Sequence, residues 1–150
     1  MERTKEQKTL NIFAIIEMVA GIVGLVIGIM MFALGGAVFG FSSELITETG
    51  ATAEQVNQIG GLFSGTGLAG IITAILHIVA GVLMRKAVND PTKYKGARTL
   101  VMASIALAIV GLILSIISKD SQTIVNNLVS LLIDGYVFTL LNKIKNSVEA

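Results

Sequence analysis

Residues 10–41 read LNIFAIIEMVAGIVGLVIGIMMFALGGAVFGF, and this stretch decides the class of the protein. Only Asn11 and Glu17 interrupt its apolar character. About 20 apolar residues at 1.5 Å each are enough for a helix to cross the roughly 30 Å hydrocarbon core of a bilayer. Because the stretch is longer than one crossing requires, we expect a tilted helix, or one that ends near Gly35 and Gly36 and continues into the interface.

The composition agrees with a membrane protein and excludes several other classes. The chain has 150 residues, of which 53% are hydrophobic and 14% charged, with a formal net charge of +1. Soluble domains carry about 25% charged residues, and disordered chains are far less apolar. The absence of cysteine excludes a disulfide framework and a catalytic thiol. Eleven basic residues against ten acidic ones argue against a nucleic-acid partner.

Three further stretches predict transmembrane helices, at about 62–84, 99–118 and 121–141. The last is the weakest, because it contains Asn126, Asn127, Ser130 and Asp134, and a central Asp costs about 3 kcal/mol on insertion. An amphipathic helix lying in the interface is the alternative for this segment. With 10–41, these spans predict an all-α, polytopic four-helix bundle that forms a single integral membrane domain.

The distribution of basic residues predicts the orientation. Ten of the eleven fall in the two terminal segments and the middle loop, and Lys119 is the exception: Arg3, Lys5, Lys8, Arg85, Lys86, Lys93, Lys95, Arg98, Lys143 and Lys145. The segment 42–61 has no basic residue but three glutamates. The positive-inside rule therefore places both termini in the cytoplasm. Thr52 and Gln55 have the spacing of a capping box, which predicts a short outer helix through Ile59.

The middle loop is also a candidate contact site for anionic lipid headgroups or a partner. Its basic residues are Arg85, Lys86, Lys93, Lys95 and Arg98. Each basic residue near such a surface contributes about 1 kcal/mol of attraction. The alternative is that these basic residues only set the orientation of the protein in the membrane and have no further role.

Small residues recur at steps of three and four, which predicts close helix packing. They are Gly21, Gly24, Gly28 and Gly35 in the first span, Gly67, Gly70, Ala74 and Gly81 in the second, and Ser104, Ala108, Gly111, Ser115 and Ser118 in the third.

Three ionisable residues fall inside the predicted spans: Glu17, His77 and Asp134. Each is eight or nine residues from the nearest basic edge, so all three are expected about 12 to 14 Å inside it. Ionisable groups in a membrane are costly and indicate function. Together with Asn127 and Ser130 they form a candidate polar cluster that relays protons or binds a cation. A hydrogen-bonded clasp between helices is the alternative. No metal or cofactor is expected, because their spacing does not match a metal-binding pattern.

The arrangement resembles two groups of membrane proteins. The charged N-terminus, the glycine-rich first helix with Glu17, the acidic outer loop and the Lys93-Tyr94-Lys95-Gly96-Ala97 turn are similar to the small four-helix membrane proteins of Gram-positive bacteria grouped as DUF4064-like. That resemblance implies a fold and a location but no activity. Glu17 in the first of four helices also resembles the small multidrug-resistance transporters, which exchange protons for cationic drugs, although this chain lacks their tryptophan.

The sequence contains none of the common catalytic motifs, so we expect no enzyme. The first functional hypothesis is an accessory protein of a bacterial cytoplasmic membrane, such as a complex subunit, an envelope-stress factor or an immunity factor, with a membrane-protein partner or a second copy of itself. The alternative is a small proton-coupled transporter or channel that uses Glu17, His77 and Asp134.

Overall fold

The structure is a computed structural model that describes residues 3–119 and 121–149, and these residues are almost entirely helical. The elements in order are α1 (Lys5–Gly40), α2 (Ser42–Thr49), α3 (Ala53–Asn89), a 3-10 turn (Pro91–Lys93), α4 (Tyr94–Ser118) and α5 (Ser121–Glu149). Four helices in the described part of the chain are long and apolar enough to cross a membrane: α1, α3, α4 with the preceding 3-10 turn, and α5. The predicted all-α class with four long apolar helices is therefore confirmed.

The long helices extend beyond the apolar stretches. Helix α3 begins at Ala53, nine residues before the predicted span at 62, and α5 continues to Glu149 instead of ending near 141. Hydropathy detects only the part of a helix that suits hydrocarbon, whereas the backbone hydrogen bonds continue wherever the residues favour a helix.

A short helix lies between the first two long helices as predicted, but at other residues than predicted. The capping box forms, because the Thr52 N–H donates to Gln55 Oε1 at 2.9 Å and the Gln55 N–H donates to Thr52 Oγ1 at 3.2 Å. It begins α3 itself and not a separate helix through Ile59. The separate short helix is α2, which ends at Thr49 and has Gly50 as its C-cap. Gly50 has a φ of 69° and donates its N–H to Ile46 O, and this left-handed conformation suits glycine.

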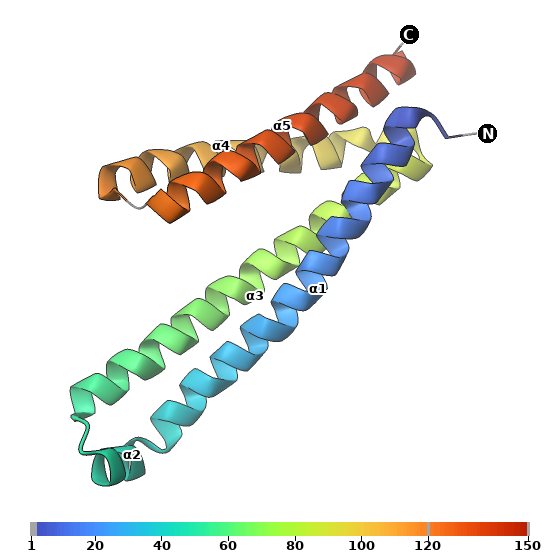
Figure 1. The fold of residues 1–150 in the computed structure, drawn as a ribbon. Helices are drawn as coiled ribbons and strands as arrows, with labels where there is room; N and C mark the ends of the chain where they lie inside the picture. The colour runs from blue at the N-terminus through green and yellow to red at the C-terminus, as the bar shows by residue number, and fades with distance from the viewer. Residues whose placement is uncertain (1–2, 120, 150) are drawn as a thin grey trace. The chain divides into compact units, whose positions relative to one another are not determined.

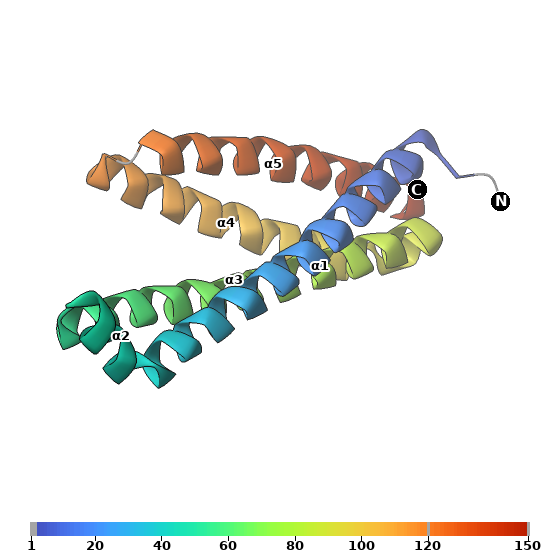
Figure 2. The ribbon, with the colours of Figure 1, turned by 60° about the horizontal axis from the view of Figure 1, so that its bottom comes forward.

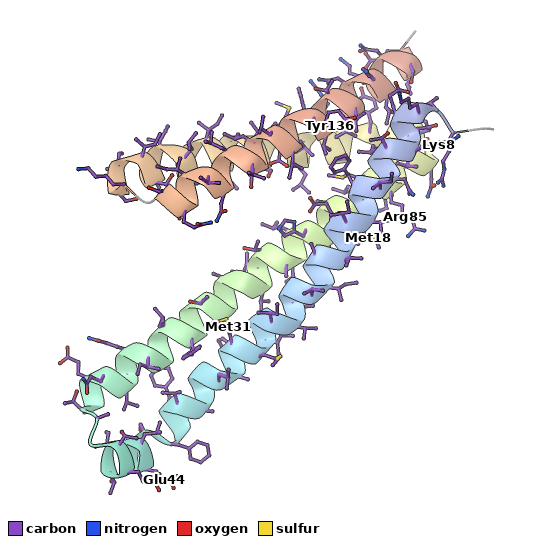
Figure 3. All side chains as sticks on the ribbon, viewed as in Figure 1. Lys8, Met18, Met31, Glu44, Arg85 and Tyr136 are labelled. Atoms are coloured by element: carbon purple, nitrogen blue, oxygen red, sulfur yellow. The ribbon has the colours of Figure 1, made fainter. Side chains whose placement is uncertain are left out.

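The chain divides into two compact units, which we describe separately. The glycine unit is Glu17–Val79. In it, the greater parts of α1 and α3 run antiparallel and side by side, with α2 at the end where the chain turns back (Figure 1; Figure 2). Figure 3 labels Glu44 on α2 and Met18 and Met31 along α1.

The terminal unit comprises Met1–Ile16 and Ala80–Ala150. All four long helices contribute to its buried core: Leu10 and Ala14 from α1, Met84, Ala87 and Val88 from α3, Tyr94, Ala97 and Val101 from α4, and Val137, Leu141 and Ile144 from α5. Helices α4 and α5 pack along one another as a hairpin (Figure 2). The core of this unit is therefore a four-helix core.

Large apolar side chains cover the outer surfaces of both units. Leu62 in the glycine unit is 70% exposed, and Ile117 and Leu132 in the terminal unit are 72% and 76% exposed. Water does not favour so much apolar surface, whereas lipid tails do, so these surfaces fit a protein embedded in a bilayer.

Candidate functional site

Two series of small residues form the contact between α1 and α3 in the glycine unit. Buried glycines recur every seven residues on α1, at Gly21, Gly28 and Gly35, and buried small residues recur every seven on α3, at Gly60, Gly67 and Ala74. A period of seven is typical of helices that wind around each other in a left-handed sense. The contact is therefore continuous over the length of the hairpin.

At these positions the two backbones approach so closely that a side chain would not fit. A Cβ atom built on Gly28 would lie 2.8 Å from Ile71 N, and one on Gly35 would lie 2.6 Å from Ser64 N. One on Gly67 would lie 2.7 Å from Phe32 Cα. The helices can pack at this distance only because these residues are glycine.

The other glycines that were predicted to pack have more space around them. A Cβ on Gly24 would lie 3.4 Å from Ala74 Cβ, and one on Gly70 would lie 3.5 Å from Gly28 Cα, both ordinary contacts. Gly81 is buried in the terminal unit. Gly111 of α4 faces Asn127 of α5, whose Oδ1 would lie 3.1 Å from an added Cβ.

Glu17 and His77 form the polar contact between α1 and α3. His77 Nδ1 lies 2.5 Å from Glu17 Oε2, although the two residues are 60 positions apart in the sequence. The Glu17 side chain is 20% exposed and the His77 side chain 45% exposed. Each residue lies on the same face of its helix as the small residues that pack, because Gly21 is four residues after Glu17 on α1 and Ala74 is three residues before His77 on α3. Glu17 is therefore partly enclosed at this contact, whereas His77 is the more exposed of the two.

Asp134 makes a different contact, in the terminal unit. Ser104 Oγ of α4 donates a hydrogen bond to Asp134 Oδ2 of α5 at 2.6 Å. Ser104 and Gly111 are seven residues apart, as are Asn127 and Asp134, so both pairs lie on one seam of the α4–α5 hairpin. Along this seam Asn127 Nδ2 is buried and has no hydrogen-bond partner among the described residues. Ser130 is exposed.

The residues of the predicted polar cluster thus form two separate contacts, Glu17 with His77 in the glycine unit and Asp134 with Ser104 in the terminal unit. Within residues 3–119 and 121–149, no three His, Asp or Glu side chains come together as metal ligands could.

The basic residues of the middle loop do not share one environment. Arg85, Lys86 and Lys95 are exposed, and Lys93 Nζ lies 3.1 Å from Asp90 Oδ2. Arg98 was grouped with them as a lipid- or partner-facing residue, but it is only partly exposed and packs within the protein. Its Nε donates to Asn142 Oδ1 at 3.0 Å, and its guanidinium lies 5.3 Å from the centre of the Phe138 ring. Arg98 therefore joins α4 to α5.

Four glycines in the glycine unit have open surroundings, and the sequence reasoning did not single them out as a packing face. They form two pairs with a spacing of four residues, Gly36 with Gly40 on α1 and Gly61 with Gly65 on α3. Nothing lies within 4 Å of where their Cβ atoms would be. Their spacing was the available signal, but it is the same spacing that Gly24 and Gly28 show, so spacing alone could not separate open from occupied faces.

Comparison with known proteins identifies no relative of this chain. No family model matches the chain, and no curated protein or solved structure matches it either.

Proposed function

We propose that this chain is a non-enzymatic accessory protein of a bacterial cytoplasmic membrane, which acts by packing its helices against a transmembrane helix of another protein. The ten-to-one distribution of basic residues supports an orientation with both termini in the cytoplasm. The role fits a subunit of a membrane complex, an envelope-stress factor or an immunity factor.

The observation that carries this proposal is the contrast between the two sets of glycines. Gly28 and Gly67 are needed for the hairpin itself, whereas Gly61 and Gly65 are exposed and touch nothing. A glycine within a helix costs about 1 kcal/mol relative to alanine, and in lipid that cost brings no packing in return. A pair of small residues four positions apart lets a second helix approach closely. The open pairs therefore fit a contact with a helix outside this chain.

The chemistry of the partner follows from the same surface. The exposed residues near the open glycines are apolar, such as Leu62 and Leu68 on α3. No charged side chain lies between Glu54 and Arg85 on this helix, apart from His77 when it is protonated. A matching partner is an apolar transmembrane helix with its own small residues, held by close packing and not by charge.

Site-specific photo-crosslinking in the membrane of the expressing cell tests this proposal. A photoreactive amino acid at position 68, where Leu68 is 51% exposed, lies on the same face of α3 as Gly61 and Gly65 and leaves both glycines in place. The same amino acid at position 59 lies on a different side of α3, where Ile59 is 49% exposed. We expect one discrete adduct with another membrane protein from position 68 and none from position 59. Gly61→Leu should abolish that adduct, because a leucine would occupy the open face.

Two results would count against the proposal. Equal adducts from positions 68 and 59 would mean that α3 meets neighbours at random in the bilayer. Adducts formed only with a second copy of the chain would make the face a self-association surface. The chain contains no cysteine, so disulfide crosslinking of single-cysteine variants gives an independent check for that second copy.

A small proton-coupled transporter or channel is the second candidate, and the contact between Glu17 and His77 favours it. Flux across proteoliposomes that contain the purified protein tests this candidate. A transporter should lose flux in Glu17→Gln. Absent flux, or flux that is unchanged in both Glu17→Gln and Asp134→Asn, would dismiss it.

A further inference from the structure

The contact between Glu17 and His77 uses one specific atom of the imidazole. His77 Nδ1 lies 2.5 Å from Glu17 Oε2. Two bare acceptors at this distance repel each other, so a hydrogen lies between them. Either the neutral imidazole donates its Nδ1–H to the carboxylate and Nε2 has a free lone pair, or a protonated carboxyl donates to Nδ1 of an imidazole that carries its hydrogen on Nε2. In both cases the second ring nitrogen, Nε2, is not used by this contact.

The His77 side chain, which carries the unused nitrogen, is partly exposed. His77 Nε2 has no hydrogen-bond partner among the described residues, and the His77 side chain is 45% exposed. Glu17 is more enclosed, with 20% of its side chain exposed. The imidazole is therefore the more exposed member of the pair, and Nε2 is the nitrogen that the contact leaves unused.

The charge of the pair depends on that nitrogen. With Nε2 unprotonated, the pair carries one negative charge in a part of α1 and α3 that is otherwise apolar. The other ionisable residues of the glycine unit are Glu44, Glu48 and Glu54, which lie at or near α2, where the hairpin turns back. None of them can neutralise Glu17. A net charge in hydrocarbon is costly, so a proton added at Nε2 removes the charge and its cost together.

We propose that Glu17 and His77 form an intramembrane proton-binding site that takes up a proton at His77 Nε2. Uptake forms a bond between the incoming proton and the Nε2 lone pair, and it converts the pair from a net charge of −1 to zero. The other proton remains between His77 Nδ1 and Glu17 Oε2, bonded to one of these two atoms. Release reverses the step and returns the proton to water. This proposal is about proton binding alone, so it does not depend on whether the protein transports ions or binds a partner.

The chain offers an unambiguous reporter for this site, because His77 is its single histidine. Full-length protein labelled with ¹⁵N and ¹³C histidine and reconstituted in lipid vesicles gives one set of imidazole signals. We expect solid-state NMR between pH 4 and pH 10 to show one transition, in which Nε2 becomes protonated as the pH falls while Nδ1 keeps its hydrogen bond. A fixed clasp would show no transition in this range, and that result would overturn the proposal.

The variant Glu17→Gln tests the role of the carboxylate. Glutamine has nearly the same shape and still accepts a hydrogen bond from Nδ1, but it has no charge. Because uptake at Nε2 neutralises the charge of this carboxylate, removing that charge should alter the Nε2 transition and the Nδ1 signal together. The matched control is Glu54→Gln, which removes a glutamate of the same unit outside the pair and should leave both signals unchanged. Equal effects of the two variants, or no effect of Glu17→Gln, would also overturn the proposal.

Discussion

At the scale of single residues, glycine decides which faces of α1 and α3 meet. Most residues of these helices are apolar on every side, so hydrophobicity does not select one face in lipid. Close backbone approach does, because it brings many atoms into dispersion contact that lipid tails do not replace. Among the backbone contacts of these glycines, that of Gly67 with Phe32 is the tightest in the hairpin.

The substitutions Gly67→Ala and Gly65→Ala should therefore have opposite effects on stability, although the two positions are only two residues apart in the sequence. The methyl group at position 67 would force α1 and α3 apart, and we expect a loss of about 1 to 3 kcal/mol in the free energy of unfolding. At position 65 the methyl group meets nothing, and alanine favours a helix by up to about 1 kcal/mol over glycine. Equilibrium unfolding in mixed micelles measures both. A loss of stability in both variants would contradict the description of an open face.

The sequence predicted some of these single-residue features and missed others. Counting residues from the basic edges placed Glu17 and His77 at one depth, and the small-residue stripes placed both on inward faces, so their contact was predictable. The hydrogen bond from Ser104 to Asp134 was not predicted, because a count along one helix carries no information about which side chain of a neighbouring helix it meets. The occupied and open glycines were not separable, because a sequence with sixteen glycines contains several equivalent spacings.

At the scale of elements, the α4–α5 hairpin depends on a polar contact inside an apolar span. Ser104→Ala removes the donor to Asp134 and leaves the carboxylate without a hydrogen-bond partner among residues 3–119 and 121–149. We expect a loss of about 1 kcal/mol or more in the free energy of unfolding, since hydrogen bonds between membrane helices contribute about this much. Ser115→Ala is the matched control, because Ser115 Oγ donates only to Leu112 O of its own helix. If Ser115→Ala costs as much as Ser104→Ala, the contact with Asp134 has no special weight.

The turn between α3 and α4 should respond to acid. Asp90 accepts hydrogen bonds from the Thr92 hydroxyl at 2.6 Å and from the Thr92 N–H at 3.2 Å. The Thr92 hydroxyl and then Lys93 hold the pKa of Asp90 below its usual value of 3.8. A lowered folded-state pKa means that this contribution is present above about pH 4 and is lost as the pH falls through the lower, folded-state value.

Amide exchange at Thr92, corrected for the intrinsic effect of pH on exchange, measures this contribution. We expect protection at pH 6 that decreases below pH 4, and Asp90→Asn should be less protected at pH 6 with a flatter pH dependence. Protection that is independent of pH in the native chain would show that the charge of Asp90 does not hold the turn.

At the scale of the whole molecule, a net charge of +1 is the sum of two opposite groups. The segments predicted to be cytoplasmic hold ten basic and four acidic residues, whereas the predicted outer segments hold one basic and four acidic residues. Glu17 and Asp134, within the spans, account for the remaining two acidic residues. Such an asymmetry sets the orientation of insertion, because basic residues resist transfer across the membrane. The helices follow from hydropathy and spacing, whereas the orientation follows from charge alone.

Labelling of single cysteines from outside the cell tests that orientation. The chain has no cysteine, so each variant carries one reactive thiol and the native chain is the unlabelled control. Ser43→Cys on α2 and Ser147→Cys near the end of α5 make the same small change at two exposed positions. An impermeant maleimide should label Ser43→Cys in intact cells, and it should label Ser147→Cys only after permeabilisation. The reverse pattern would show that both termini face outward, and labelling of both variants in intact cells would show that the number of crossings between them is not three.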